Sequence, residues 1–272
     1  MRRAVGLPWQ MLRGAVALTY LFIFTPIVIT ALVSFNSINQ SKFPPVGFSM
    51  RWWDDALSER WLQPLWFSVQ LATLTAVIAT LLGLPLAFGL TRYKFPGRNI
   101  LVALSLGPLA LPALVTGIGI LQFFQTAGLA ALFGFPALLI GHVVICLPFS
   151  VRTIAISLRA MPAKVEQAAA NLGARPARVF LEITLPLIRS GLFAGAIFCF
   201  IQSFTDYSVS LFLSRAGMQP ISIAILSYID YGFTPTLAAV AVLTLVVPLV
   251  LIAAVQHFFG IGDFLYGARD SG

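Results

Sequence analysis

The chain has 272 residues, of which 59% are hydrophobic and 10% are charged, and its mean hydropathy is +0.93. A soluble domain carries about 25% charged residues, so this composition excludes an ordinary soluble protein and predicts an all-α integral membrane protein surrounded by lipid. The net charge of +8 is not arranged in basic stripes, so we expect no nucleic-acid partner.

Six stretches of the chain are apolar enough to cross a bilayer, which needs about 20 such residues per helix. In chain order they are residues 14–35, 65–90, 101–124, 133–151, 191–213 and 236–259. No linker divides the chain, so we expect one transmembrane domain over residues 1–272. An even number of spans places both termini on the same side.

The basic residues predict which side this is. Thirteen lysine and arginine residues fall on the side of the termini and four on the other, and such an excess is typical of the cytoplasmic side. The thirteen are Arg2, Arg3, Arg13, Arg92, Lys94, Arg98, Arg152, Arg159, Lys164, Arg175, Arg178, Arg189 and Arg269. On the outside, the loop of residues 36–64 carries three tryptophans that we expect to act as an anchoring belt at the membrane surface.

The longest polar interval runs from Met161 to Gly191, between the fourth and fifth spans. Good helix formers occupy its first part, Gly173 is placed to stop a helix in the left-handed conformation, and Pro176 suits the first turn of a second helix. The interval therefore predicts two short cytoplasmic helices around a break, an arrangement suited to gripping a partner.

Catalytic motifs are lacking in the sequence. It contains no H-E-x-x-H, no G-x-S-x-G and no Cys/His cluster, so we expect neither a catalytic residue nor a metal site. It also contains no G-x-x-x-x-G-K-[ST] phosphate loop. If ATP drives this chain, another polypeptide must bind the nucleotide.

The polar interval resembles the EAA loop of ABC importer permeases of the binding-protein-dependent type. That loop has the pattern E-A-A, then a glycine, then I-x-L-P, and Gln167 stands here where the family has glutamate, with Glu166 one residue earlier. The positions that fall in register are Ala168, Ala169, Gly173, Ile183, Leu185 and Pro186. The likeness extends to the six spans and covers nearly the whole chain.

The resemblance implies a type I ABC importer permease fold, in a bacterial inner membrane, whose 161–190 loop is a coupling helix that docks on a cytoplasmic ATPase. It also implies a homologous second permease, two ATPase subunits that bind ATP and Mg²⁺, and an extracytoplasmic solute-binding protein, so we expect no cofactor in this chain. The alternative is a loop that only stabilises its own bundle. The expected ATPase-coupling residues are Glu166, Gln167, Ala168, Ala169, Leu172, Gly173, Arg175 and Phe180.

The fifth span contains Asp206, the one acidic residue within any predicted span, whose burial costs about 2.5–3.5 kcal/mol on insertion scales. Gln202, Ser203, Asp206 and Ser210 are expected to form a polar stripe on one helical face. The stripe is a candidate solute path that favours a cation. In the alternative, Asp206 forms hydrogen bonds with backbone or hydroxyl groups and holds a gate shut. His142, alone in the fourth span, is expected to be a structural histidine with its hydrogen bonds satisfied.

The segment from Phe43 to Trp52 is similar to the spermidine/putrescine branch of these permeases, so a polyamine is the expected solute. That branch also contains permeases for other small organic solutes and for ferric iron, which stay as alternatives. An ion-coupled secondary transporter or a membrane enzyme has less support, because one intramembrane carboxylate supplies neither a coupling network nor a catalytic cluster.

Overall fold

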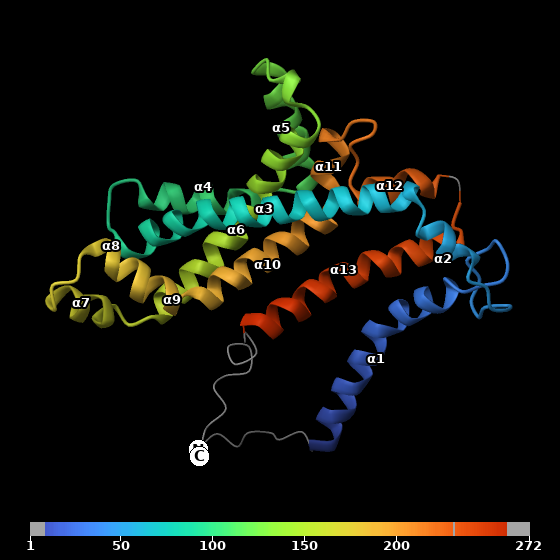
Figure 1. Ribbon diagram of the computed structural model, residues 1–272, viewed down its shortest axis with the longest axis horizontal. Helices are drawn as coiled ribbons and strands as arrows, with labels where there is room; N and C mark the ends of the chain where they lie inside the picture. Colours follow the sequence, from blue (N-terminus) through green and yellow to red (C-terminus); the bar gives the residue numbers. More distant parts are fainter. Residues whose placement is uncertain (1–8, 231, 260–272) are drawn as a thin grey trace. The chain divides into compact units, whose positions relative to one another are not determined.

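The computed structural model describes residues 9–230 and 232–259, which form helices and two isolated β-bridges but no strand (Figure 1). Four of these helices are long and apolar enough to cross a membrane. They are α1 (Trp9–Val33), α3 (Glu59–Arg92), α6 (Phe135–Ala160) and α13 (Pro235–Phe259). They agree with the first, second, fourth and sixth predicted spans and with the all-α membrane class.

The third predicted span, residues 101–124, is not one straight helix. It is divided into α4 (Arg98–Ala110) and α5 (Ala113–Thr126), whose axes are bent by 111°. A proline disfavours the helical conformation of the residue before it. Leu111, which precedes Pro112, is accordingly extended, with ψ 144°. The prediction of a continuous helix is therefore wrong at this point.

The fifth predicted span, residues 191–213, is interrupted as well. Helix α10 (Arg189–Thr205) ends before Asp206, which is extended with φ −68° and ψ 129°. A new helix, α11 (Ser208–Leu213), follows. The helical segment Pro176–Leu187 leads into α10 at an angle of 65°. The prediction of one continuous fifth helix is therefore wrong. The Asp206 side chain accepts the hydrogen bonds of the first N–H groups of α11, in place of backbone carbonyls of the preceding turn, as described below.

The remaining helical elements are short and connect the long ones. They are α2 (Arg51–Ala56), the 3-10 turn η1 (Ala130–Leu132), α7 (Ala163–Asn171), α8 (Pro176–Val179), the π-helical turn η2 (Phe180–Thr184), α9 (Leu185–Leu187) and α12 (Ile221–Ile229). Two compact units result: residues up to 62 with 228–246, and residues 63–227 with those from 247 onward. The single domain over residues 1–272 stays a prediction, and its ends lie outside the described residues.

In the larger unit, α6 and α10 form the most extensive helix pair (Figure 1). A Cβ atom at Gly195 would lie 2.6 Å from Thr153 Oγ1, and one at Gly191 would collide with the Ser157 side chain. The G-x-x-x-G spacing thus lets the two backbones approach closely. The start of α10 therefore carries a small-residue packing face.

A second part of this core lies where α3 and α6 lead into the polar segment. Its buried members come from the ends of α3 and α6 and from the residue before α10. They are Ala87, Leu90, Val151, Ile154, Leu158 and Ile188. Fully buried aliphatic side chains pack at crystal-like density, so this end of the helices forms a firm base for the segment that follows.

The smaller unit is held together by the loop between α1 and α3. The Asn36 side chain donates to the Gln40 and Lys42 carbonyls at 3.2 and 3.1 Å. Trp52 Nε1 donates to the Asn36 carbonyl at 2.6 Å. Trp61 is buried against Tyr228, with ring centroids 5.2 Å apart. Trp52 and Trp61 therefore make structural contacts in this unit. The anchoring belt at the membrane surface stays a prediction.

Candidate functional site

The polar segment between α6 and α10 has the two-helix shape that its sequence predicts. Gly173 has φ +86°, so α7 stops in the left-handed conformation. Behind it, Gly173 N donates to the Ala170 carbonyl at 2.9 Å and Ala174 N donates to the Ala169 carbonyl at 3.1 Å. These two bonds make a Schellman motif, which satisfies the last carbonyls of the helix. Pro176 then opens α8 at its first position, as predicted.

One side of this segment faces away from the protein. Gln167 and Ala168 of α7 are exposed, and Ala169 is half-buried. Leu172, next to the glycine stop, is 89% exposed, the highest value for any large hydrophobic side chain in the described residues. Arg175 is exposed just beyond. We call Gln167, Ala168, Leu172 and Arg175 the outward face: small and apolar in part, with a cation at its edge.

Two other predicted coupling residues, Glu166 and Phe180, point inward. The Glu166 carboxylate lies 3.0 Å from Arg92 Nε and accepts a hydrogen bond from Thr184 Oγ1 at 2.8 Å. The Phe180 ring packs edge-on against Phe88, with centroids 5.5 Å apart. Both therefore fasten the segment to α3, and their role in coupling to an ATPase stays a prediction.

Arg92 is a functional candidate that the sequence-based reasoning missed. It is the last residue of α3, and its side chain is 18% exposed while that of Glu166 is 17% exposed. A charge at the end of one span and an opposite charge in the polar segment were both visible in the sequence. Their contact across more than seventy residues was not.

Asp206 occupies the break between α10 and α11. Its Oδ2 accepts hydrogen bonds from the backbone N–H groups of Val209 and Ser210 at 3.0 and 3.2 Å. The first N–H groups of a helix have no partner within it, and an acidic side chain at this end also suits the helix dipole. The predicted single stripe is wrong in form, because Asp206 lies in a break and not on a helical face. In the described part of the chain, Gln202 makes no hydrogen bond to this group.

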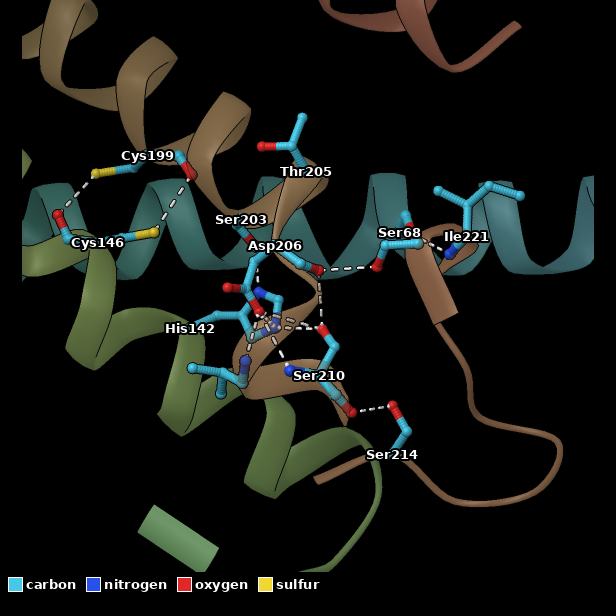
Figure 2. A network of polar contacts seen from close by, with 12 residues as sticks. Ser68, His142, Cys146, Cys199, Ser203, Thr205, Asp206, Ser210, Ser214 and Ile221 are labelled. Atoms are coloured by element: carbon cyan, nitrogen blue, oxygen red, sulfur yellow. Dashed lines mark hydrogen bonds and ion pairs between the residues drawn. The ribbon is translucent and has the colours of Figure 1, made fainter. Parts of the chain in front are cut away.

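The other three residues of the stripe do come together, around a residue of α6 (Figure 2). His142 Nδ1 lies 2.7 Å from Ser203 Oγ, and His142 Nε2 lies 3.0 Å from Ser210 Oγ and 3.7 Å from Asp206 Oδ2. We call these four residues the His142 cluster. Both ring nitrogens have a partner, as expected of a structural histidine.

The His142 cluster is sealed in this structure. Asp206 is 6% exposed, Ser203 is 3% exposed, and His142 and Ser210 are fully buried. Polar groups inside a membrane protein pair with one another, so a polar partner for Asp206 could have been anticipated on that ground. The closed geometry favours the interpretation of a lock that joins α6, α10 and α11 over that of an open solute path.

Two cysteines link α6 and α10 beside this cluster (Figure 2). The Cys146 thiol donates to the Cys199 carbonyl at 3.4 Å, and the Cys199 thiol donates to the Cys146 carbonyl at 3.3 Å. Both are buried and free. Among residues 9–230 and 232–259, no three His, Cys, Asp or Glu side chains gather as they would around a metal ion.

Comparison with known proteins places this geometry in a family. Residues 79–260 match the model of a family described as "Binding-protein-dependent transport system inner membrane component". The spermidine/putrescine transport system permease protein PotC of Escherichia coli (strain K12) is 31% identical over 252 residues, which cover 91% of this chain and 93% of PotC. The putrescine transport system permease protein PotI of the same strain is 30% identical over 248 residues, which cover 88% and 86%.

A solved structure shows the same fold. A bacterial alginate ABC transporter, in complex with an alginate pentasaccharide-bound periplasmic protein, contains a chain that superposes with a TM-score of 0.71. The two sequences are 14% identical, and the match covers 92% of each chain. At that identity the likeness shows the fold alone.

Proposed function

Because the chain belongs to the family of inner membrane components of binding-protein-dependent transport systems, we propose that it forms half of a solute pathway and is driven through residues 161–190 by a separate ATPase. The observation that carries this proposal is the outward face, which spans α7 and the turn that follows it. It combines an almost fully exposed leucine with small neighbours and a cation.

Such a face fits a groove on a partner protein. Short helices dock by placing an apolar anchor in a groove, while charged side chains surround the contact. Leu172 is the anchor, Ala168 permits close approach, and Arg175 lies at the rim. If ATP drives this transport, the partner must bind the nucleotide, because the sequence has no phosphate loop of its own. ATP and Mg²⁺ therefore belong to the partner subunits, and no residue of this chain is assigned to them.

The inward contacts connect α7 mechanically to the membrane-spanning helices. With Glu166 tied to Arg92 and Phe180 packed on Phe88, a movement of α7 is passed to the end of α3. We place this end in the cytoplasm on the basic residues around it. Arg2, Arg3 and Arg269, which contribute to the same count, lie outside the described residues. Rigid-body movement of such a segment is a common way to switch a helix bundle between two states.

We infer the partners of the chain from its family and from the exposed surfaces of two of its helices. In α1 and α13 the most apolar windows are 6% and 11% buried. Lipid and a second, homologous permease would cover these side chains. An extracytoplasmic binding protein would deliver the solute; the alginate transporter, which shares the fold, was solved with a periplasmic protein of that kind.

For the solute we propose a polyamine. The support is the identity to PotC and PotI over most of the chain, together with the names of those two permeases. Another small organic solute and ferric iron are the alternatives. The fold does not distinguish them, because it also occurs in a transporter of an acidic polysaccharide.

The test is a reconstituted uptake assay. The chain is purified with its ATPase and second permease, placed in proteoliposomes, and supplied with the binding protein and labelled putrescine or spermidine. We expect uptake that requires ATP and stops when Leu172 is replaced by aspartate. Uptake that persists without ATP would contradict the proposal that an ATPase drives transport. The binding protein loaded with another solute could stimulate ATP hydrolysis when no amine does so. That result would contradict only the choice of a polyamine as the solute.

A further inference from the structure

A cavity of about 620 Å³ lies between the ends of α3, α4 and α6, and nothing above assigns it a function. Three arginines line it: Arg98 at the start of α4, and Arg152 and Arg159 near the end of α6. The second and third are seven residues apart, so they lie on the same helical face, roughly 10 Å apart along the axis.

These arginines have no acidic counterpart. No Asp or Glu lines the cavity. Within residues 9–230 and 232–259, none of the three arginines forms an ion pair with a carboxylate. Arg98 Nε donates to the Leu90 carbonyl at 2.8 Å, which fixes its position, and the other two side chains are exposed. The cavity therefore has a cationic mouth that is not neutralised by the described protein.

The rest of the lining is apolar except for Thr91 and Ser105, whose hydroxyls donate to carbonyls of their own helices. Farther along α4 it consists of Leu106, Leu109 and Ala110. The arginines lie at the expected membrane boundary: the third span was predicted to begin at residue 101, and the fourth to end at residue 151. A ligand that fits is anionic at one end and hydrocarbon at the other, and it approaches from the bilayer.

We infer that this cavity binds an anionic phospholipid, with its headgroup phosphate at Arg98, Arg152 and Arg159 and an acyl chain along α4. Guanidinium groups match phosphate oxygens in geometry and charge. Basic pockets between membrane helices on the cytoplasmic side are suited to acidic lipid headgroups. The same charge disfavours a polyamine, so under the proposed function this is a site separate from the solute path.

The position of the cavity gives the lipid a structural consequence. Arg159 precedes the polar segment by two residues, and the Leu90 carbonyl that holds Arg98 lies two residues before Arg92. A phosphate bound here joins the ends of α3, α4 and α6, and of these helices α6 leads into the polar segment while α3 contacts it. Bound lipid is therefore expected to raise the thermal stability of the chain.

The experiment measures lipid binding to the full chain in detergent, and to the assembled complex, by native mass spectrometry and thermal unfolding. Phosphatidylglycerol is compared with phosphatidylcholine of the same acyl chains and with inorganic phosphate. The variant R152Q/R159Q removes two charges from the cavity and leaves Arg98 in place. The matched control R13Q/K94Q removes two exposed charges from the same predicted side, outside the cavity.

We expect R152Q/R159Q to bind phosphatidylglycerol about tenfold to thirtyfold more weakly than the wild type, and R13Q/K94Q to bind it with unchanged affinity. Raising the salt concentration should weaken wild-type binding, a result that does not depend on the variant folding. Equal binding of phosphatidylcholine, or equal affinity of R152Q/R159Q, would overturn the inference. So would full competition by inorganic phosphate, which indicates a site for small anions, or loss of the lipid on assembly, which indicates a protein partner in the cavity.

Discussion

Arg92 Nε lies 3.0 Å from the Glu166 carboxylate, so an ion pair joins the last residue of α3 to helix α7. Thr184 donates to the same carboxylate from η2. Glu166 thus ties together three elements at the point where force from an ATPase would enter the bundle. Glu166 therefore orients α7, and under the proposed function the outward face is left to contact the partner.

Replacing Glu166 should separate transport from ATP hydrolysis. Glu166→Gln keeps the hydrogen bond from Thr184 but loses the charge, and Glu166→Ala loses both. We expect stability to fall by about 1 kcal/mol in the first and by more in the second. Transport per ATP hydrolysed should fall in the same order. The assay compares uptake with phosphate release in proteoliposomes, and equal ratios in all three proteins would refute the role of this tie.

Leu172 offers a sharper test of docking, because its side chain is 89% exposed and contributes little to the packing of the chain. Leu172→Asp should leave expression and thermal unfolding of the isolated chain unchanged and should weaken co-purification with the ATPase by tenfold or more. Leu172→Met keeps an apolar anchor of similar size and serves as the control. If both variants retained the ATPase equally, the outward face would not be the docking surface.

Gly173 is required for its backbone conformation and not for space. A Cβ atom there would meet nothing within 4 Å, yet φ is +86°. Gly173→Val should therefore disrupt the stop between α7 and α8, at a cost of about 1–2 kcal/mol, whereas Gly173→Asn should be tolerated, because asparagine adopts this conformation more readily. Transport should be retained by the asparagine variant and reduced by the valine variant. Equal activity of the two would show that the left-handed stop is dispensable.

The His142 cluster predicts a difference between two substitutions of Asp206. Asn still accepts hydrogen bonds from Val209 and Ser210, while Ala leaves the first turn of α11 without its cap, which costs about 1–2 kcal/mol. We expect Asp206→Ala to lower the unfolding temperature of the complex clearly and Asp206→Asn to lower it slightly. A solute contact would instead appear as a raised KM for the cationic solute in Asp206→Asn at unchanged stability, and that result would reject the lock.

Some of this architecture could be predicted from local sequence. The stop at Gly173 and the restart at Pro176 depend on a glycine and a proline whose conformational preferences act within one turn. The interruptions of the third and fifth predicted spans were harder to predict. Pro112 follows a break, but Pro85 and Pro148 lie inside continuous helices. A proline therefore shows where a helix can break, and the surrounding packing decides whether it does.

The site was predictable in part for the same reason. Ser203, Asp206 and Ser210 were expected to gather because they are close in sequence, and they do gather, through a break and not along a helix. Their meeting with His142, and that of Glu166 with Arg92, join residues of different helices. Such contacts depend on how helices cross, and residue spacing within one segment carries no information about that.

The proposed contact between the outward face and an ATPase can be tested directly by crosslinking. A photo-crosslinking residue is placed at position 172 or at position 166 in the complex assembled with its ATPase, and the crosslinked subunits are identified after irradiation. We predict a crosslink to the ATPase from position 172 and none from position 166, whose side chain is turned toward α3. A crosslink from 172 only to this chain or to lipid, with the ATPase present and hydrolysing ATP, would contradict the account.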